Sequence, residues 1–408
     1  MACRFCGHIL MVPFLDLGTA PPSNAYLTVA ALREPEAWYP LRCVVCTHCW
    51  LVQTADPIDP KRLFTDDYGF FSSVSSTWTA HAERFVEQFV ARFGLNAKSR
   101  VLEIAANDGC LLERVAARGI HCLGVEPTAA TAAAARGRGL EIVEAFFGNT
   151  LARKLLSEHG PFDLVIANNV LAHVPAILDF AEGIATVLAP AGVASIEFQW
   201  VVNMVSSGQF DTAYHEHYSY LSLTAVERIL AAAGLRAFDV EEVPTHGGSL
   251  RVLVELTGNG QREVTGGLAA TRDRERALGV ASADFYAGLQ ARAERCKNAL
   301  LATLIDARAN GRSVAAYGAA AKGNTLLNFA GVRPDLLPYV VDRSPGKAGR
   351  FLPGSRIPVV GEQRLKEDRP ELILILPWNL REEIAAQLSY ARAWGARFVT
   401  AIPTLEIL

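Results

Sequence analysis

Short apolar runs alternate with helical patterns through the middle of the chain. Between Ser99 and about Leu256, each apolar run ends at polar or glycine residues, and a stretch with apolar residues at helical spacing follows. Alternation of this kind is typical of strands in a mostly parallel sheet that is covered by helices. The predicted strands lie at residues 101–105, 121–125, 140–143, 163–167, 193–199 and 249–256.

Helical patterns flank this region on both sides. Before it, apolar Phe85, Phe89 and Val90 share one face of a predicted helix over residues 78–93. After it, residues 261–308 are rich in Ala, Arg and Glu at helical spacing and predict a helical connector. The rest of the chain repeats the alternation of strands and helices. The strands predicted there lie at residues 313–317, 339–341 and 372–376.

Paired cysteines mark the N-terminal segment. Cys3 and Cys6 form one Cys-x-x-Cys motif, and Cys46 and Cys49 form a second. Four thiolates at such spacing are typical of a tetrahedral, structural zinc site with no open coordination position. Cys43 also precedes Cys46 at this spacing, but we favour Cys46 with Cys49 because a strand can begin directly after that pair. The alternative is a set of reduced, buried cysteines, and small core residues are expected for the isolated ones, Cys110, Cys122 and Cys296.

These patterns predict an α/β protein in three parts. Residues 1–62 form a small zinc ribbon, and residues 63–256 form a Rossmann-like domain with a helical lead-in. Residues 257–408 hold the helical connector and a second Rossmann-like domain. A chain of 408 residues is long enough for two or three domains of about 150 residues each.

Composition and charge exclude several classes of protein. Lys and Arg number 39 against 42 Asp and Glu, a net charge of −3, and no basic stripe suggests binding to a nucleic acid polymer. The longest apolar runs are far shorter than the ~20 residues of a membrane span. The first residues lack the apolar core of a secretory signal, and the cysteines do not resemble a disulfide framework. We expect a cytoplasmic enzyme, either a monomer or a weak homo-oligomer.

The first strand of the middle region ends in a polar turn, Asn107-Asp108-Gly109, and a helical pattern follows. In a doubly wound sheet, such a strand, turn and helix form the usual place for a nucleotide-type cofactor. Glu126 ends the next strand about 20 residues later and can accept both hydroxyls of a ribose. Because the turn lacks the three glycines that let a backbone approach a diphosphate, S-adenosylmethionine (SAM) fits better than a dinucleotide. The alternative is a structural Asn-Asp cap.

Titratable side chains gather in the segment Tyr214-His-Glu-His-Tyr-Ser-Tyr220, for which packing offers no reason. Imidazoles with a near-neutral pKa suit proton abstraction, with an acid or phenol to orient them. A metal site built from His215, Glu216 and His217 is a rival interpretation, although neighbouring residues point in different directions. A solvated loop is the third. His173 follows another predicted strand, so it could lie near a transferable methyl group or serve as a local hydrogen-bonding group.

Two further turns carry candidate ligand groups. Lys322 lies at a helix start after a predicted strand, within a run of small residues, and could hold a phosphate. The alternative is a tight joint between strand and helix. His246-Gly247-Gly248 forms a glycine-rich turn with a single histidine, just before the last strand of the middle region.

Taken in order, these motifs resemble the zinc-containing, SAM-dependent sugar C-methyltransferases, the group that includes the tetronitrose-pathway C-3'-methyltransferase. The resemblance covers essentially the whole chain, and the order and spacing of the motifs make it specific. The motifs are Cys3-x-x-Cys6, Cys46-x-x-Cys49 followed by Leu-Val-Gln53, Phe71-Ser-Ser73, Glu103 through Asn107-Asp-Gly109, Gly124-x-Glu126-Pro127, Asn169 through His173-x-Pro175, Tyr214-x-Glu216-His217, His246-Gly-Gly248, Tyr317-Gly-Ala-x-Ala-Lys322 and Trp378-Asn379.

The resemblance implies an enzyme that methylates the carbon beside the ketone of a nucleotide-linked 4-keto-deoxysugar, in deoxysugar and antibiotic biosynthesis. A dTDP-sugar is the favoured substrate, and C-3 is the favoured carbon, with C-5 as the alternative. His217 is implied as the base, Glu216 and Tyr214 as orienting or proton-relaying groups, and His173 as a group near the keto oxygen or the sugar hydroxyls. The implied ligand sets are Glu103, Ala105, Asn107, Asp108, Gly109, Glu126, Pro127, Asn168 and Asn169 for SAM, and Phe71, Ser72, Ser73, His246, Gly247, Lys322 and Asn324 for the substrate.

The chain departs from the family at one position. Where the family shows Tyr-x-Tyr before the serine pair, this chain has Tyr68-Gly69-Phe70, so the second hydroxyl is missing. Either Tyr68 takes the catalytic role, or the enzyme handles a different sugar or carbon. Two other functions stay open, namely O- or N-methylation of another small molecule and non-catalytic binding of a sugar nucleotide.

Overall fold

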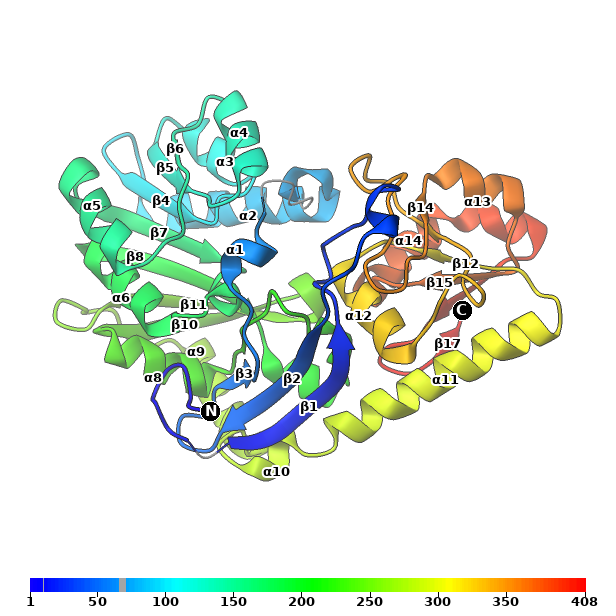
Figure 1. Ribbon diagram of the computed structural model, residues 1–408. Helices are drawn as coiled ribbons and strands as arrows, with labels where there is room; N and C mark the ends of the chain where they lie inside the picture. Colours follow the sequence, from blue (N-terminus) through cyan, green and yellow to red (C-terminus); the bar gives the residue numbers. More distant parts are fainter. Residues whose placement is uncertain (10, 66–70) are drawn as a thin grey trace.

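The computed structural model describes residues 1–9, 11–65 and 71–408, with Ser76 described by its backbone alone. Over these residues the chain forms three β-sheets, of four, seven and six strands. In Figure 1 the strands of the first sheet run between a lobe built on the second sheet and a lobe built on the third. The α/β fold with an N-terminal ribbon and two Rossmann-like sheets, predicted from the sequence, is confirmed.

The first sheet joins the N-terminal segment to the middle of the chain. β1 (Met11–Ala20), β2 (Tyr39–Cys46) and β3 (Val52–Thr54) pair in that order, and all the pairs are antiparallel. β9 (Ser219–Tyr220) adds a fourth strand beside β3. The ribbon is therefore completed by a short segment that lies far along the sequence. The short helix α1 (Pro60–Leu63) follows, with Asp59 capping its N-terminus through a bond from the Lys61 amide at 3.0 Å.

The second sheet has the strand order β10-β11-β8-β7-β4-β5-β6. Its strands from β8 to β6 are parallel, whereas β11 and β10 are antiparallel additions at the other edge. Each strand predicted between residues 101 and 256 is present, but β10 was not predicted. The strands are β4 (Arg100–Ile104), β5 (His121–Val125), β6 (Ile142–Val143), β7 (Phe162–Asn168), β8 (Leu188–Gln199), β10 (Leu235–Val243) and β11 (Ser249–Leu256).

Helices cover both faces of the second sheet. The predicted helix before it is α2 (Ser76–Phe93), whose N-terminus is capped by the Ser75 side chain and whose C-terminus ends at Gly94 with φ +63°. Phe85 and Phe89 are buried against the sheet. The other helices here are α3 (Leu112–Ala116), α4 (Ala129–Gly137), α5 (Asn149–His159), α6 (Ile177–Val187), α7 (Val201–Ser206) and α8 (Leu223–Ala232).

The connector predicted after the second sheet is helical, and its longest helix, α11 (Leu289–Ala309), runs beside the third sheet in Figure 1. That sheet has the order β14-β13-β12-β15-β16-β17, parallel except for β17. None of the helices over the described residues is both long and apolar enough to cross a bilayer. The remaining elements are α9 (Gly266–Leu278), α10 (Ala283–Tyr286), β12 (Val314–Tyr317), α12 (Ala321–Ala330), β13 (Val340–Val341), β14 (Val359–Val360), α13 (Glu362–Asp368), β15 (Leu372–Ile375), α14 (Arg381–Gln387), β16 (Arg397–Thr400) and β17 (Glu406–Ile407).

Candidate functional site

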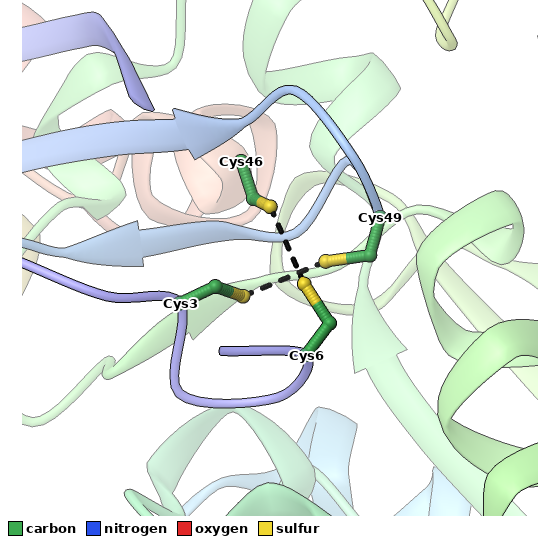
Figure 2. A group of neighbouring side chains, drawn as sticks. All are labelled: Cys3, Cys6, Cys46 and Cys49. Carbon is green, nitrogen blue, oxygen red and sulfur yellow. Dashed lines mark hydrogen bonds between the residues drawn. The ribbon is translucent and has the colours of Figure 1, made fainter. Parts of the chain in front are cut away.

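The four cysteines predicted as metal ligands meet at one end of the first sheet (Figure 2). The Sγ atoms of Cys3 and Cys49 lie 3.5 Å apart, those of Cys6 and Cys46 lie 3.6 Å apart, and all four lie within 4.8 Å of one another. A tetrahedral zinc ion with bonds of about 2.3 Å requires sulfur–sulfur distances of about 3.8 Å, so the thiols fit a structural zinc site. Cys43 does not belong to the group, and burial raises the pKa of its thiol to about 12.

A cavity of about 550 Å³ opens where the three sheets approach one another, a volume typical of small-molecule sites. Its wall includes residues from the N-terminal ribbon, from the ends of β4, β5 and β7, and from the first turn of α12. Most of the site residues predicted from the sequence line it. They are Ser72, Glu103, Ala105, Asn107, Glu126, Pro127, Asn168, Asn169, His173, Tyr214, Glu216, His217, His246 and Lys322.

Some predicted residues lie behind this wall and support it. The Ser73 amide and hydroxyl both donate to Asp108 Oδ2, the amide at 3.2 Å, and the Ser72 amide donates to Asn107 Oδ1 at 2.9 Å. The serine pair is therefore fastened to the cofactor turn. Gly109 closes that turn with φ +77°, in a space where an added Cβ would overlap a leucine side chain. Asp108, Gly109 and Ser73 thus shape the cavity without lining it.

Three further predicted residues lie outside this lining. Phe71 directly precedes the short 3-10 helix that carries the serine pair. An added Cβ at Gly247 would come within 2.6 Å of a tryptophan ring, which explains the glycine. Asn324 is buried in α12, where its Nδ2 donates to the Ser23 carbonyl at 3.5 Å. Tyr68 lies outside the described residues.

The loops that follow β4 and β7 have unusual backbone conformations. Ala105, Asn107 and Asn169 have φ values of +58°, +51° and +55°, which non-glycine residues rarely adopt. Such conformations persist where the surrounding structure determines them strongly, and they cluster at ligand sites. Both loops leave the carboxyl ends of parallel strands, the edge at which ligands bind in open α/β sheets.

Polar atoms without partners surround this end of the cavity. Within the described residues, Glu103 Oε2 and both side-chain polar atoms of Asn168 have no hydrogen-bond partner, although they are buried. Burial, and next the charge of Glu126, raises the pKa of Glu103 well above its ordinary value. Glu126 itself accepts from the amides of Asn107 at 2.9 Å and Thr128 at 3.0 Å. A ligand with ammonium, carboxylate and ribose hydroxyl groups would satisfy these atoms, so the residues fit SAM.

The candidate catalytic rings form a second group in the lining of the cavity. The rings of His217 and Tyr214 are 3.9 Å apart between centroids, and those of His217 and His173 are 4.7 Å apart. His217 Nδ1 lies 2.9 Å from the Thr212 carbonyl, and His173 Nδ1 lies 2.9 Å from the Glu216 carbonyl. Because a carbonyl can only accept, each Nδ1 carries the proton and each Nε2 keeps its lone pair. Burial lowers the pKa of His217 well below its usual range and that of His173 to about 4, so both rings are neutral.

The residues beside His217 divide between the cavity and the protein interior. Glu216 lines the cavity and accepts a bond from Asn24 Nδ2 at 2.6 Å. Burial, and next the charge of Glu216, raises the pKa of Tyr214 well above its ordinary value, so this phenol keeps its proton. His215 is not part of the lining, and its Nε2 lies 3.3 Å from the Tyr39 carbonyl. The rival metal site at this segment is therefore not formed, since the cysteine group is the one metal-ligand cluster among the described residues.

A third group of side chains comes from α12 and from the turn after β15. The Lys322 ammonium donates to Asn379 Oδ1 at 2.9 Å and lies 4.7 Å from the centroid of the Trp378 ring. The Trp378 indole in turn donates to Asp211 Oδ2 at 2.8 Å. Burial raises the pKa of Asp211 to about 7, lowers that of Lys322 and lowers that of His246 to about 4. Trp378 therefore links the two Rossmann-like sheets beside the cavity.

The sequence did not lead to Asn24, Asp211 or Lys347. Asn24 and Lys347 line the cavity, and Lys347 Nζ donates to the Ala319 carbonyl at 2.8 Å. Both come from irregular loops, where no periodic pattern marks a side chain that faces a site. Asp211 had a detectable signal, since it is a carboxylate three residues before Tyr214, at the start of the polar segment.

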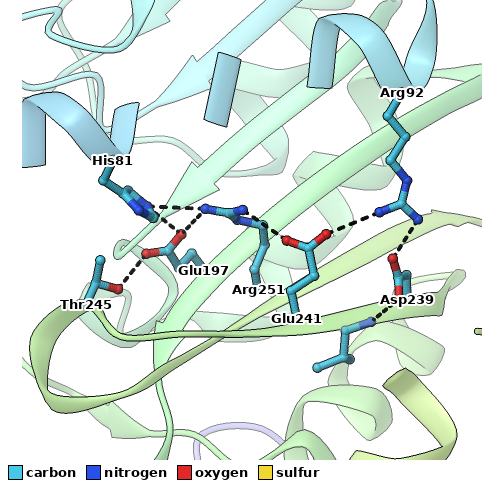
Figure 3. Close-up of polar contacts among 8 residues, drawn as sticks. His81, Arg92, Glu197, Asp239, Glu241, Thr245 and Arg251 are labelled. Atoms are coloured by element: carbon cyan, nitrogen blue, oxygen red, sulfur yellow. Dashed lines mark hydrogen bonds and ion pairs between the residues drawn. The ribbon is translucent and has the colours of Figure 1, made fainter. Parts of the chain in front are cut away.

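A buried polar network surrounds Glu197 (Figure 3). It reaches the wall of the cavity through Asn169. Glu197, at the end of β8, has a fully buried side chain. Its Oε2 lies 3.1 Å from His81 Nε2 and 3.1 Å from Arg251 Nη2, and its Oε1 accepts from Thr245 Oγ1 at 2.9 Å and Asn169 Nδ2 at 3.4 Å. One carboxylate thus connects α2, β11, the loop after β7 and the turn that carries His246.

Charge complementarity keeps this carboxylate ionised. Burial alone would raise the pKa of Glu197, but the hydrogen bond from His81 and the charges of His81 and Arg251 lower it to about 2. The network continues to the surface through alternating charges. Its outer members are Glu241, Arg92 and Asp239.

Comparisons with protein families assign each part of the chain. Residues 3–64 match a zinc binding domain, residues 78–240 match a methyltransferase domain, and residues 244–403 match the C-methyltransferase C-terminal domain. Zinc and SAM are therefore the cofactors of this chain, in agreement with the cysteine group and the cavity. The non-catalytic alternative is not supported.

A full-length relative agrees with these matches. The chain is 31% identical over 406 residues to the C-methyltransferase NovU from Streptomyces niveus. The match covers 100% of this chain and 96% of NovU. Two solved methyltransferase structures resemble part of the chain. A magnesium protoporphyrin IX methyltransferase from Synechocystis has 15% identity and a TM-score of 0.34, over 43% of this chain and 78% of its own. A SAM-dependent methyltransferase from Archaeoglobus fulgidus has 19% identity and a TM-score of 0.33, over 40% and 69%. The full-length match shows that the chain belongs to the family of zinc-containing, SAM-dependent C-methyltransferases.

Proposed function

We propose that this C-methyltransferase acts on a nucleotide-linked 4-keto-deoxysugar, with a dTDP-sugar favoured, and methylates the carbon beside the ketone in deoxysugar biosynthesis. C-3 is the favoured carbon and C-5 the alternative. The observation that carries the proposal is the state of His217. Its Nδ1 is committed to the Thr212 carbonyl, so Nε2 of a neutral, buried imidazole remains as a base in a ring that lines the cavity.

A ketone acidifies the hydrogens on the neighbouring carbons, and His217 Nε2 can remove one of them. Tyr214 keeps its proton because its pKa is raised, so its hydroxyl can donate to the oxygen on which negative charge develops. His173 presents an Nε2 lone pair, which suits a sugar hydroxyl better than a keto oxygen. Asn24 holds Glu216 in place beside these groups. Bound SAM supplies the electrophilic methyl group that the activated carbon requires.

The residues proposed to hold SAM come from the ends of β4 and β7 and from the loops that follow β4, β5 and β7. Glu103 and Asn168 offer buried polar atoms that lack partners within the described residues, and Glu126 offers a carboxylate at the end of β5. Asp108 and Gly109 shape the turn behind them. The full proposed set is Glu103, Ala105, Asn107, Asp108, Gly109, Glu126, Pro127, Asn168 and Asn169.

The nucleotide part of the substrate is proposed to lie towards Lys322 and His246. The direct contacts of the Lys322 ammonium are a neutral amide and an aromatic face, and the buried Asp211 acts on its charge from nearby. A phosphate group could pair with the ammonium directly. Lys347 adds a second cationic side chain to the same wall. The proposed division into residues 1–62, 63–256 and 257–408 then gives each part a share of the site.

The proposal is tested by a mass-shift screen with SAM and dTDP-, GDP- and CDP-linked 4-keto-deoxysugars. We expect a product heavier by one methyl group from at least one of them, and solvent deuterium at the carbon beside the ketone when SAM is omitted. A methyl ether or methylamine product, or turnover without such exchange, would contradict the proposal. His217→Asn should abolish both reactions while SAM affinity, measured by calorimetry, stays nearly unchanged.

A further inference from the structure

Arg4 connects the zinc site to the segment that carries the proposed base. It lies between Cys3 and Cys6, the two zinc ligands of the first Cys-x-x-Cys motif, which we call the zinc knuckle. Its guanidinium donates to the Thr54 carbonyl through Nη1 at 2.8 Å and to the Tyr218 carbonyl through Nη2. Its side chain thus spans from the metal site to the residue that directly follows His217.

The Tyr218 carbonyl also lies next to the pairing of β3 with β9. β3 pairs with β9 in the register Val52 to Tyr220 and Gln53 to Ser219, and the Thr54 amide donates to the Tyr218 carbonyl at 3.0 Å. The Tyr218 carbonyl therefore accepts from both Thr54 and Arg4. These contacts come entirely from the N-terminal ribbon.

The ribbon also fixes Arg4 itself. The Arg4 amide donates to Gln53 Oε1 at 3.0 Å, so its backbone is tied to β3. Cys3 and Cys6 on either side hold the same short loop to the metal. A planar guanidinium with two directed donors transmits this fixed position better than a flexible ammonium.

We propose that Arg4 is a positioning residue for catalysis, through which the zinc knuckle holds the segment after His217 in its working geometry. This inference rests on the proposed role of His217 as the base. The Tyr218 amide donates to the Ala172 carbonyl at 2.8 Å, next to His173, so the segment is held between the ribbon and the second histidine. Loss of the Arg4 contacts would weaken the ribbon side alone, because the bond from the Thr54 amide and the pairing of β3 with β9 remain. A displacement of a reacting group by about 1 Å can cost about 100-fold in rate.

The test compares Arg4→Gln and Arg4→Lys with Arg42→Gln. Arg42 is in the same ribbon but pairs with Asp56 at the surface, at 2.7 Å, so it controls for loss of one arginine. Four quantities are measured: zinc content by atomic absorption, SAM affinity by calorimetry, kcat on the 4-keto-deoxysugar accepted in the screen, and hydrogen exchange of the amides of residues 214–220.

We expect Arg4→Gln to keep zinc and SAM affinity, to lower kcat by about 10- to 100-fold and to speed exchange of residues 214–220. Arg4→Lys should recover part of kcat, because lysine keeps the charge but lacks the two directed donors of the guanidinium. Arg42→Gln should match the unaltered protein. Unchanged kcat in both Arg4 variants would overturn the inference, whether or not exchange changes. Loss of zinc and SAM binding in both would also overturn it, because Arg4 would then be a general folding residue. If the His217→Asn variant is inactive in these cases, the proposed function stands and only the role of Arg4 fails.

Discussion

Replacing Glu197 with glutamine should destabilise the protein by about 3 kcal/mol at neutral pH. Glu197 is fully buried and is contacted by His81, Arg251, Thr245 and Asn169. Glutamine has only one acceptor oxygen, and its NH2 group would face N–H or O–H donors on one side. The interactions lower the pKa of Glu197 from 4.5 to about 2. At 1.36 kcal/mol per pKa unit this corresponds to about 3 kcal/mol, within the range for breaking a buried ion pair.

The sign of the pH dependence follows from this lowered pKa. Since the carboxylate is favoured in the folded state, its contribution is complete above about pH 5 and is lost as the pH falls from 4.5 towards 2. The difference in unfolding free energy between the unaltered protein and Glu197→Gln should therefore be larger at pH 6 than at pH 3. It should shrink by roughly half by pH 3.

Urea titrations followed by tryptophan fluorescence measure this difference at each pH. Glu241→Gln is the matched control, because Glu241 contacts the same Arg251 at 3.1 Å but is 38% exposed, and exposed pairs contribute about 0 to 1 kcal/mol. Equal stability of Glu197→Gln and the unaltered protein at pH 7 would refute the reasoning. A difference that grows as the pH falls would refute it as well.

Three other changes test separate parts of the site. Gly109→Ala should weaken SAM binding and lower the melting temperature, because φ is +77° and the new Cβ would overlap Leu140. In Asp211→Asn, which removes the carboxyl with a pKa of about 7, the kcat profile should stay flat from pH 8 to pH 6. Burial lowers the pKa of His217, so protonation inactivates the base only at lower pH. Chelation of zinc should unfold the N-terminal sheet and abolish activity, and Cys46→Ser should have the same effect. Cys43→Ala should keep the metal, because Cys43 is not a ligand.

Each of these has a discriminating outcome. Gly119 has φ +72° with open space around it, so Gly119→Ala measures the backbone strain without an overlap. An equal loss of stability in Gly119→Ala and Gly109→Ala would contradict the overlap at Gly109. An acid limb centred near pH 7 that persists in Asp211→Asn would contradict a neutral His217, because Asp211 itself has a pKa of about 7. Full activity and unchanged circular dichroism after zinc release, followed with a metal-sensitive dye, would contradict a structural role for the ion.

The sequence predicted strands well where apolar runs are continuous and poorly where a strand carries charge. β10 was missed because its pattern contains Asp239 and is interrupted by a bulge between Ala237 and Asp239, which breaks the alternation of faces. Asp239 is compatible with this position because Arg92 of α2 lies 2.6 Å away. That contact joins distant segments, and no local pattern reveals it.

In the site, too, local motifs could be predicted from the sequence, whereas contacts between distant segments could not. The cysteine pairs, the cofactor turn and the segment around His217 are local motifs, so the sequence predicted that they would face a site. Glu197 and Arg251 form a charged pair only because β8 and β11 are neighbours in this register. The approach of Asn24 to Glu216 likewise depends on how the ribbon sits on the second sheet. Such contacts require the strand order, which periodicity does not determine.

The pairing of β3 with β9 limits how this enzyme can be cut or recombined. A fragment that ends after the ribbon would leave the edge of β3 exposed, and unpaired edges invite aggregation. A chimera that takes its ribbon from a relative would need residues 219–220 from the same relative, or the register beside the proposed base would be mismatched. Modules that are separate in the sequence would thus have to be exchanged as one unit.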